Sequence, residues 1–511
     1  MGVIGDLEFS RVQNLPTWVF FAIPIAFLIL RTLLTGIYNL YFHPLSHIPG
    51  PKRALFIPGY YTILLLSGRV HITVARLHNL YGPHLRLGPS TISFSSPTSW
   101  KHIYGHIGGR KTFLKSPMYD QGGDPHVRDI VSERDPAKHG PLRRLTSHAF
   151  SAKALTEQED VVQAYVDKLV CQINVHATKQ PEEMVKWYNF ATFDVIGDLA
   201  FGQPFGSLDN GEPHFWVSMI LDSVTAAAWK MVAVKIAGTG RLSKYLMPRG
   251  LREKRERHYE YSRKTVERRI NSPTTRKDFM SKILSEKDAK GYDLTFLTHH
   301  SSVLIVAGSE TTATFLSGVT YYLCRTPHAY AKLTQELRSA FSSYEHITGM
   351  ETERCSYLKA VIDEGLRIYP PVSFGLPRTS PGEIVDGVFL PEGTECFTSS
   401  WAATHSELNF HRPYDFLPER WLDPDCTDQK EASQPFSLGS RVCLGRNLAL
   451  MEMRLILAKM LWVYDMELVD DVDKLDWVRD GTANPLWRKP PLMVRFTRRE
   501  GVRVGVLDDE A

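Results

Sequence analysis

The sequence predicts a mainly α-helical body with small β-sheets, preceded by a transmembrane helix. Three observations support this class. A long apolar run lies near the start of the chain, and apolar residues at helical spacing dominate the rest. Strand-like segments are few and do not alternate regularly with helices. A doubly wound parallel sheet is therefore not expected.

Length and composition are those of an ordinary globular protein, long enough for one large domain. Of 511 residues, 43% are hydrophobic and 23% are charged. The 60 Lys and Arg residues exceed the 56 Asp and Glu residues by only four, which is too little to indicate a nucleic-acid partner. The six cysteines are widely spaced and form no CxxC pair, so we expect reduced thiols rather than a zinc site or a disulfide scaffold.

Residues 15–42 are expected to form a transmembrane anchor. Arg31 is the only charged residue in this stretch, and about 20 apolar residues in a helix cross a bilayer. The run is too long for the apolar core of a signal peptide. Lys52 and Arg53 follow it, which places the body in the cytosol and residues 1–14 in the lumen as a short N-terminal segment. An interfacial helix remains the alternative because Arg31 interrupts the run.

Residues 43–53, "HPLSHIPGPKR", contain three prolines and are expected to form a stiff hinge before a body of residues 54–511. Helices are predicted over residues 158–178, 187–200, 252–271, 294–324, 328–341, 356–368 and 444–463. Strands are predicted near residues 84–96, 382–396 and 492–499.

Glu310 is the only charged residue between Asp293 and Arg325. A second transmembrane span is possible by length, but two His, many Ser and Thr, and a central carboxylate would be costly in lipid. We therefore predict a helix through the core. At its centre, "AGSETT", Ala307 and Gly308 would let a bulky flat group approach the backbone, next to Glu310 and Thr311. A helix-packing contact with an incidental acid is the alternative.

Two further segments carry candidate functional residues. In "YLKAVIDEGLRIYPP", Glu364 and Arg367 lie three residues apart on one helical face and can pair, although such pairs are common on surfaces. In "FSLGSRVCLG", Cys443 lies between turn-forming glycines. From these residues alone it could be an inert core thiol, a nucleophile or a metal ligand.

In their order along the chain, these segments resemble the cytochrome P-450 superfamily of haem-thiolate monooxygenases. "AGSETT" is similar to the family's oxygen-activation segment. Glu364 and Arg367 match its E-x-x-R pair, and Arg420 in "PERW" matches the arginine that joins this pair. The haem-ligand motif of the family is matched by Phe436, Gly439, Arg441, Cys443 and Gly445.

The resemblance implies haem b as cofactor, with Cys443 as its axial thiolate. The two glycines of the motif would let the loop pass close to the porphyrin and aim amide groups at the sulfur. Placement just before a helix would also favour the thiolate.

It further implies that Arg441, Arg143 and Arg378 bind the haem propionates. The segment "HGPLRRLTSHAF" departs from the family pattern, because His139 occupies a position where Trp is commoner. We expect the helix of this segment to start near Gly140, which leaves His139 just before it as a candidate haem contact.

The implied activity is a monooxygenase reaction with O2 and a bulky hydrophobic substrate. Thr311 would hydrogen-bond the distal oxygen, and Glu310 would relay protons. Because 68 residues follow Cys443, electrons are expected from NADPH through a separate NADPH–cytochrome P-450 reductase. A basic proximal surface would receive this partner through Arg143, Arg144, Arg446 and Arg454.

The amino-acid sequence between these motifs is similar to that of fungal secondary-metabolite members of the trichothecene (isotrichodermin) hydroxylase type. This implies a monomer in the endoplasmic reticulum membrane, with one span and a cytosolic catalytic domain. The substrate and the choice among hydroxylation, epoxidation and ring closure stay open, as do a haem-thiolate isomerase and a non-enzymatic haem sensor. Apolar and aromatic residues in the stretches where the family contacts substrate are Phe113, Met118, Trp216, Trp229, Val372 and Phe374. His300 lies two helical turns before Ala307 on the same face, where a satisfied or surface histidine is favoured over a cavity contact.

Overall fold

The structure is a computed structural model, and the body that it describes is mainly helical. The described residues are 17–57, 59–121, 127–176, 179–212, 214–237, 247–272, 278–287, 291–469, 475–484 and 486–508. The predicted lumenal segment, residues 1–14, lies outside them.

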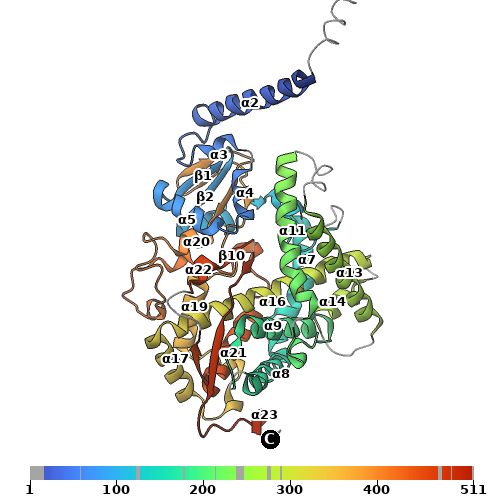
Figure 1. The fold of residues 1–511 in the computed structure, drawn as a ribbon, viewed down its shortest axis with the longest axis vertical. Coiled ribbons are helices and arrows are strands. Elements are labelled where there is room, and N and C mark those ends of the chain that lie inside the picture. Colours follow the sequence, from blue (N-terminus) through green and yellow to red (C-terminus); the bar gives the residue numbers. More distant parts are fainter. Residues whose placement is uncertain are drawn as a thin grey trace, which may run out of the picture.

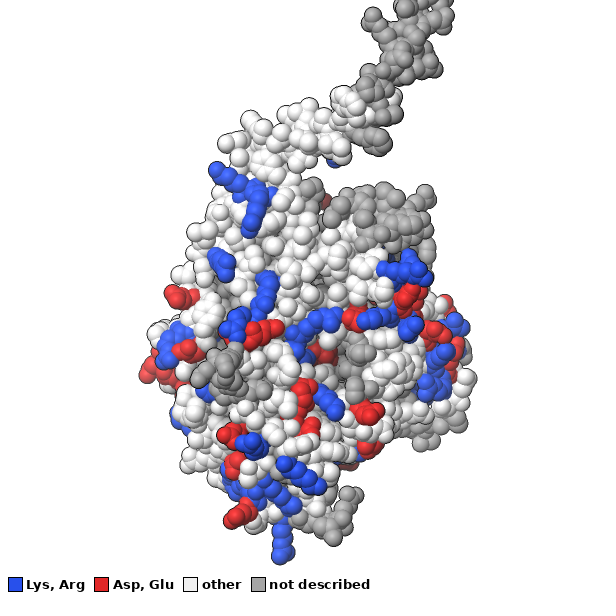
Figure 2. Space-filling view, in the orientation of Figure 1, with Lys and Arg blue, Asp and Glu red and all other residues white. Residues whose placement is uncertain are grey.

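Helix α2 (Thr17–Tyr41) projects from one end of the body and exposes its apolar side chains (Figures 1 and 2). Two described helices are long and apolar enough to cross a membrane, namely Ala22–Tyr41 within α2 and Leu294–Cys324, which is α16. Only 11% of the most apolar stretch of the first is buried, against 72% for the second. The prediction that the long central segment is a core helix is therefore confirmed.

Helix α16 runs through the middle of the molecule (Figure 1) and packs against α9, α13, α19 and α21. Its core neighbours and the other helices are α3 (Arg53–Phe56), α4 (Tyr60–Leu66), α5 (Val70–Tyr81), α6 (Pro97–Tyr104), α7 (Pro136–Ser147), α8 (Ala152–His176), α9 (Met184–Phe201), α10 (Ser207–Asn210), α11 (Phe215–Ala237), α13 (Arg249–Asn271), α14 (Phe279–Ser285), α17 (Pro327–Ala340), α18 (Gly349–Thr352), α19 (Ser356–Ile368), α20 (Ser400–Thr404), α21 (Arg446–Val463), α22 (Trp477–Asp480) and α23 (Gly505–Asp508).

Small sheets complete the body. The largest has the strand order β1-β2-β8-β5-β3 and lies near the junction with α2 (Figure 1). A three-stranded sheet has the order β4-β12-β9, and two hairpin-like pairs join β6 to β7 and β10 to β11. The strands are β1 (His84–Gly88), β2 (Thr91–Phe94), β3 (Leu114–Lys115), β4 (Glu182–Glu183), β5 (Arg378–Thr379), β6 (Glu383–Val385), β7 (Val388–Leu390), β8 (Glu395–Thr398), β9 (Tyr464–Leu468), β10 (Thr482–Ala483), β11 (Trp487–Arg488) and β12 (Met493–Arg498).

The predicted helices and strands are confirmed as elements, with ends that differ by a few residues. One predicted boundary is wrong: α7 begins at Pro136 rather than near Gly140. Asp135 caps this helix, because its side chain accepts a hydrogen bond from the Ala137 backbone N–H at 2.8 Å. Pro136 occupies the first turn, where a missing N–H costs nothing. Pro141 lies inside the helix and therefore does not mark its start.

The proline-rich segment after α2 lies against the largest sheet. Leu45 and Ile48 are buried in a cluster with β2 residues, and the Arg86 backbone N–H donates to the Pro49 carbonyl at 2.8 Å. A side chain at Gly50 would collide with the Arg86 carbonyl oxygen at 2.2 Å. The segment is thus held to the body at several points along its length, while other residues of it are exposed.

Candidate functional site

A cavity of about 370 Å³ lies between α16 and the loop that precedes α21. One wall is formed by α16 through Val303, Leu304, Ala307, Gly308, Thr311 and Thr312. The opposite wall is the segment from Pro435 to Gly445 together with the first turns of α21. Two elements more than a hundred residues apart in sequence therefore enclose one mostly apolar space.

Cys443 lies deep in the protein, yet its side chain is accessible because it opens onto this cavity. Its backbone N–H donates to the Phe436 carbonyl at 2.8 Å, which closes the loop. Burial raises the pKa of the thiol, while a backbone hydrogen bond from Gly445 and the charges of Arg143 and Arg446 oppose that effect. The expected stabilising groups are present, but burial outweighs them, so deprotonation would be coupled to binding of a metal.

The two glycines of this loop differ in what requires them. Gly439 has φ +71°, and a Cβ there would lie 2.1 Å from the Tyr104 carbonyl oxygen. Only glycine fits both that conformation and that contact. Gly445 lines the cavity, and its nearest neighbour would be Phe150 at 3.9 Å. Gly439 thus serves the turn and its packing, while Gly445 keeps the cavity wall flat.

Cationic side chains from separate segments meet at one side of the cavity. Arg143 donates to the Val442 carbonyl at 2.8 Å, and Arg441 donates to the Glu133 carbonyl at 2.7 Å. Burial, with the nearby Arg441 and Arg378, lowers the pKa of Lys115 to about 7. Burial together with Arg441, Lys115 and Arg143 lowers the pKa of His139 to about 3, so this imidazole is neutral at physiological pH. The cluster is suited to anionic groups.

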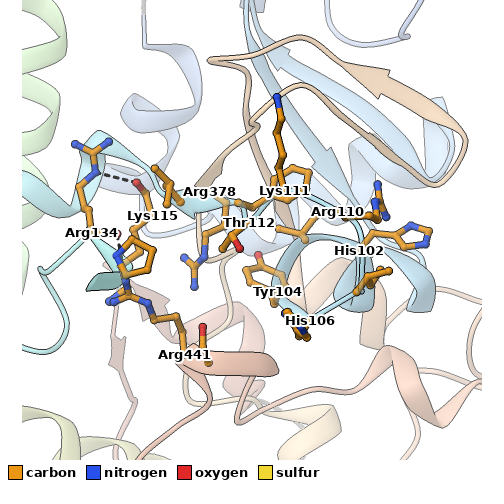
Figure 3. A pocket seen from close by; sticks show the side chains of 17 residues that line it. His102, Tyr104, His106, Arg110, Lys111, Thr112, Lys115, Arg134, Arg378 and Arg441 are labelled. Carbon is orange, nitrogen blue, oxygen red and sulfur yellow. Dashed lines mark hydrogen bonds between the residues drawn. The ribbon is translucent and has the colours of Figure 1, made fainter. Parts of the chain in front are cut away.

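Figure 3 shows a smaller polar pocket of about 140 Å³ beside this cluster, with Lys115 and Arg441 common to both spaces. Arg134 donates to the Lys115 carbonyl at 2.8 Å. Arg378 lines the smaller pocket, where its guanidinium lies 5.0 Å from the centre of the Tyr104 ring and donates to the Pro377 carbonyl at 3.1 Å. It is not among the described residues that line the larger cavity.

Thr311 and Glu310 point in different directions from α16. Thr311 lines the cavity, and its hydroxyl donates to the Ala307 carbonyl at 2.7 Å. Glu310 is 3% exposed, is not among the described residues that line the cavity, and pairs with Lys489. Gly308 serves helix packing as well as the cavity, because a Cβ there would lie 2.7 Å from Ile196 of α9.

Glu364, Arg367 and Arg420 form a fully buried ion-pair cluster behind the site. Arg367 donates two hydrogen bonds to the Glu364 carboxylate, each at 2.8 Å, and Arg420 adds a third at 3.2 Å. Burial raises the pKa of Glu364, but the charges and hydrogen bonds of Arg367 and the charge of Arg420 outweigh burial and lower it. The cluster ties α19 to the loop before α21.

Among the expected substrate contacts, Val372 lines the cavity. Trp216 does not, since it is fully buried in the core and its indole N–H donates to His258 Nδ1 at 2.7 Å. Its predicted role as a substrate contact is wrong, because an apolar residue in a helix pattern does not reveal which interior it faces. His300 is 2% exposed and lies outside the described cavity lining.

Sequence reasoning missed three residues of the site. Lys115 follows Arg110 and Lys111 closely in the sequence, and Lys489 lies in "WRKPP" near the C-terminus. Glu452 lines the cavity from α21, where burial raises its pKa to about 8, while a hydrogen bond from Thr312 opposes this. A carboxyl in the apolar stretch "LALMEMRLIL" was the one available sign of it.

The residues of the cavity fit a flat group that brings its own metal and its own carboxylates. Among the described residues, no three His, Cys, Asp or Glu side chains cluster as metal ligands, so Cys443 would supply a single protein ligand. Cations stand at one edge, and the two walls are apolar. Thiolate, cations and apolar walls are the donor set that an iron porphyrin with two propionates requires.

Comparison with known proteins agrees with this fit. The sequence family described as Cytochrome P450 matches residues 49–496. The chain is 43% identical to "Cytochrome P450 monooxygenase ORF9" of Penicillium roqueforti (strain FM164), over 91% of each chain. It is 40% identical to "Cytochrome P450 monooxygenase BOT4" of Botryotinia fuckeliana, over 92% of this chain and 90% of that one. It is also 39% identical to "Cytochrome P450 monooxygenase atr2" of Stereocaulon alpinum, over 92% and 95%.

Proposed function

The chain belongs to the cytochrome P450 family and is an oxidoreductase of the monooxygenase type. From this we propose that it inserts one oxygen atom of O2 into a bulky hydrophobic substrate. We also propose that Cys443 is the protein ligand of haem b. The observation that carries the proposal is the Cys443 thiol, which opens onto an apolar cavity opposite Thr311 of α16. Family membership implies a haem cofactor, O2, a redox partner and a small-molecule substrate.

Haem held by Cys443 supplies oxygen activation, since a thiolate ligand favours O–O cleavage. The chain supplies binding, orientation and proton control. Arg143, Arg441 and Lys115 neutralise and orient the propionates at the cationic edge, with Arg378 in the adjoining pocket. His139 adds a neutral hydrogen-bonding ring there.

On the α16 wall, the chain controls protons and excludes water. The Thr311 hydroxyl lies at the cavity surface, where it donates to the Ala307 carbonyl and, by rotating, would offer its proton to the cavity. Ala307 and Gly308 would leave room along this wall for a flat cofactor. Val303, Leu304 and Val372 exclude water and favour an apolar substrate.

The similarity to fungal monooxygenases supports a role in secondary-metabolite biosynthesis, with oxidation of a polyketide, terpenoid or alkaloid intermediate by hydroxylation or epoxidation. Electrons would come from NADPH through a separate reductase. Arg144 and Arg446 are exposed and could receive that partner's acidic surface. Arg143 and Arg454, also expected there, are engaged with the Val442 carbonyl and with Glu353.

The decisive experiment compares the absorption of the reduced, CO-bound protein before and after Cys443→Ala. We expect the thiolate-ligated band in the wild type and its loss in the variant. Cys426→Ala is the matched control, because Cys426 is a free cysteine that is not among the described residues lining the cavity. An unchanged band in Cys443→Ala would overturn the proposal. Mass analysis of products formed under labelled O2 then separates oxygen insertion from isomerisation.

We also propose that α2 anchors the protein in the endoplasmic reticulum membrane as a single span, with the body a monomer in the cytosol. Exposed apolar residues along α2, including Trp18, Phe27 and Leu34, support this. Removal of residues 1–42 should release the protein from sedimenting membranes while the absorption band is retained. Retention on membranes without α2 would show that the body itself binds the bilayer.

A further inference from the structure

The acid of the central helix is held by a lysine from the distant C-terminal part of the chain. The Lys489 ammonium donates to the Glu310 carboxylate, and it also donates to the Thr314 hydroxyl at 2.9 Å. Thr314 in turn donates to the same carboxylate oxygen at 3.2 Å. The side chains of Lys489 and Glu310 are 2% and 4% exposed, so the pair is shielded from water.

The two residues that precede Lys489 are both fixed in place. Trp487 is fully buried, its indole N–H donates to the Pro370 carbonyl at 2.9 Å, and its ring stacks on Tyr369 at 4.3 Å between centroids. Arg488 donates to the Asp222 carboxylate of α11 at 2.8 Å. Lys489 therefore meets Glu310 from a prearranged backbone rather than from a free surface chain.

Adjacent residues of α16 thus have separate environments. The Thr311 hydroxyl faces the cavity, whereas the Glu310 carboxylate is paired on another face of the helix. Removing one partner of a buried ion pair leaves the other charge uncompensated, and the group left behind then tends to neutralise or to move toward water. The next residue of α16, Thr311, faces the cavity.

We propose that Lys489 is a positioning residue for oxygen activation: its ion pair holds the Glu310 carboxylate on a face of α16 that does not line the cavity, and so determines whether this carboxylate can reach the Thr311 side of the helix. The inference rests on the proposed monooxygenase function. Lys489 itself touches neither substrate nor cofactor and acts only through Glu310 and Thr314.

The test compares Lys489→Met, Lys489→Arg and Lys459→Met during NADPH oxidation with the reductase. Lys459 of α21 is the matched control, since it is also a buried lysine and is paired with Asp167 of α8. In Lys489→Met we expect the amount of hydrogen peroxide released per NADPH to change by about tenfold. We also expect the solvent deuterium isotope effect on turnover to change in this variant. Lys489→Arg should restore values close to wild type. Equal values in Lys489→Met and Lys459→Met would overturn the proposal.

Thermal unfolding tests the contact between Lys489 and Glu310 without turnover, so its result does not depend on the proposed monooxygenase function. Thermal unfolding of Lys489→Met should occur at a lower temperature than that of the wild type, and the added change Glu310→Gln should recover part of the loss, because it removes the uncompensated carboxylate. If Lys489→Met does not fold, the experiment uses Lys489→Gln instead, because glutamine keeps a donor to Glu310. Additive effects of the two changes would contradict direct coupling, whatever the Cys443 experiment shows.

Discussion

At the scale of single residues, position on a helix decides which of two neighbouring polar groups meets the cavity. Thr311 and Glu310 are adjacent in sequence, yet successive helical residues point about 100° apart, as 3.6 residues complete one turn. Thr311 therefore lines the cavity, and Glu310 meets Lys489. The acid and the alcohol that the sequence places side by side therefore have different surroundings: the Thr311 hydroxyl faces the cavity, and the Glu310 carboxylate faces Lys489.

Thr311→Val removes the hydroxyl at the cavity and keeps the shape of the side chain. We expect haem binding to be unchanged and oxygenated product per NADPH to fall on the order of 100-fold, with peroxide formed instead, because a positioned proton donor is lost. Product and peroxide assays measure the partition. Thr298→Val is the control, since Thr298 makes the same 2.7 Å bond to a carbonyl four residues earlier on α16 but is fully buried. A similar loss in both variants would point to helix stability instead.

At the scale of elements, glycines let α16 approach its neighbours closely. A Cβ at Gly318 would lie 2.6 Å from the Tyr369 ring, and one at Gly365 of α19 would lie 2.8 Å from Phe315. Tyr369 stacks against Trp487 and is fully buried, so it cannot move aside. These contacts set the distance between α16 and α19.

Gly318→Ala should therefore lower the free energy of unfolding by about 1–3 kcal/mol, the usual cost of overpacking a filled core. Gly140→Ala is the matched change within α7, where no atom lies within 4 Å of the added Cβ. It should be neutral or stabilising by up to about 1 kcal/mol, since alanine favours helix. Denaturant unfolding measures both, and equal effects would contradict the packing argument.

At the scale of the whole molecule, buried neutral histidines make stability depend on pH. Burial lowers the pKa of His71 to about 3 and the pKa of His78 and His258 to about 4, from an ordinary value of 6.5. Below that ordinary value, the unfolded chain binds protons that the folded chain does not. The contribution of these groups to stability is therefore fully present above about pH 6.5 and is lost as the pH falls.

Each of these histidines should cost roughly 1 kcal/mol of unfolding free energy per pH unit below that value. We expect denaturant unfolding to show a clear loss between about pH 7.5 and pH 5.5. His78→Gln should reduce the slope, because His78 joins the Gly82 carbonyl and the Ser93 hydroxyl from inside the fold. An unchanged slope in this variant would mean that other groups dominate.

Much of the architecture could be predicted because its causes are local. Apolar spacing of 3.6 residues predicted α9, α16, α19 and α21, and the length of the first apolar run predicted α2. α11 was not predicted, since its apolar and polar residues show no periodic face. The start of α7 was misjudged because two prolines compete as the first helical residue, and only the Asp135 cap decides between them.

By itself, the sequence determined the long apolar helix α2, the main helices and the residues of the Cys443 loop, because run length, periodicity and motif spacing are properties of neighbouring residues. Only the tertiary structure decided that Lys115, Arg143 and Arg441 share one edge of a cavity, and that Lys489 holds Glu310 across 179 residues of sequence. Trp216 shows the same limit, since burial was foreseen but not the interior it faces. Contacts between distant segments follow from how helices pack, and no local pattern encodes them.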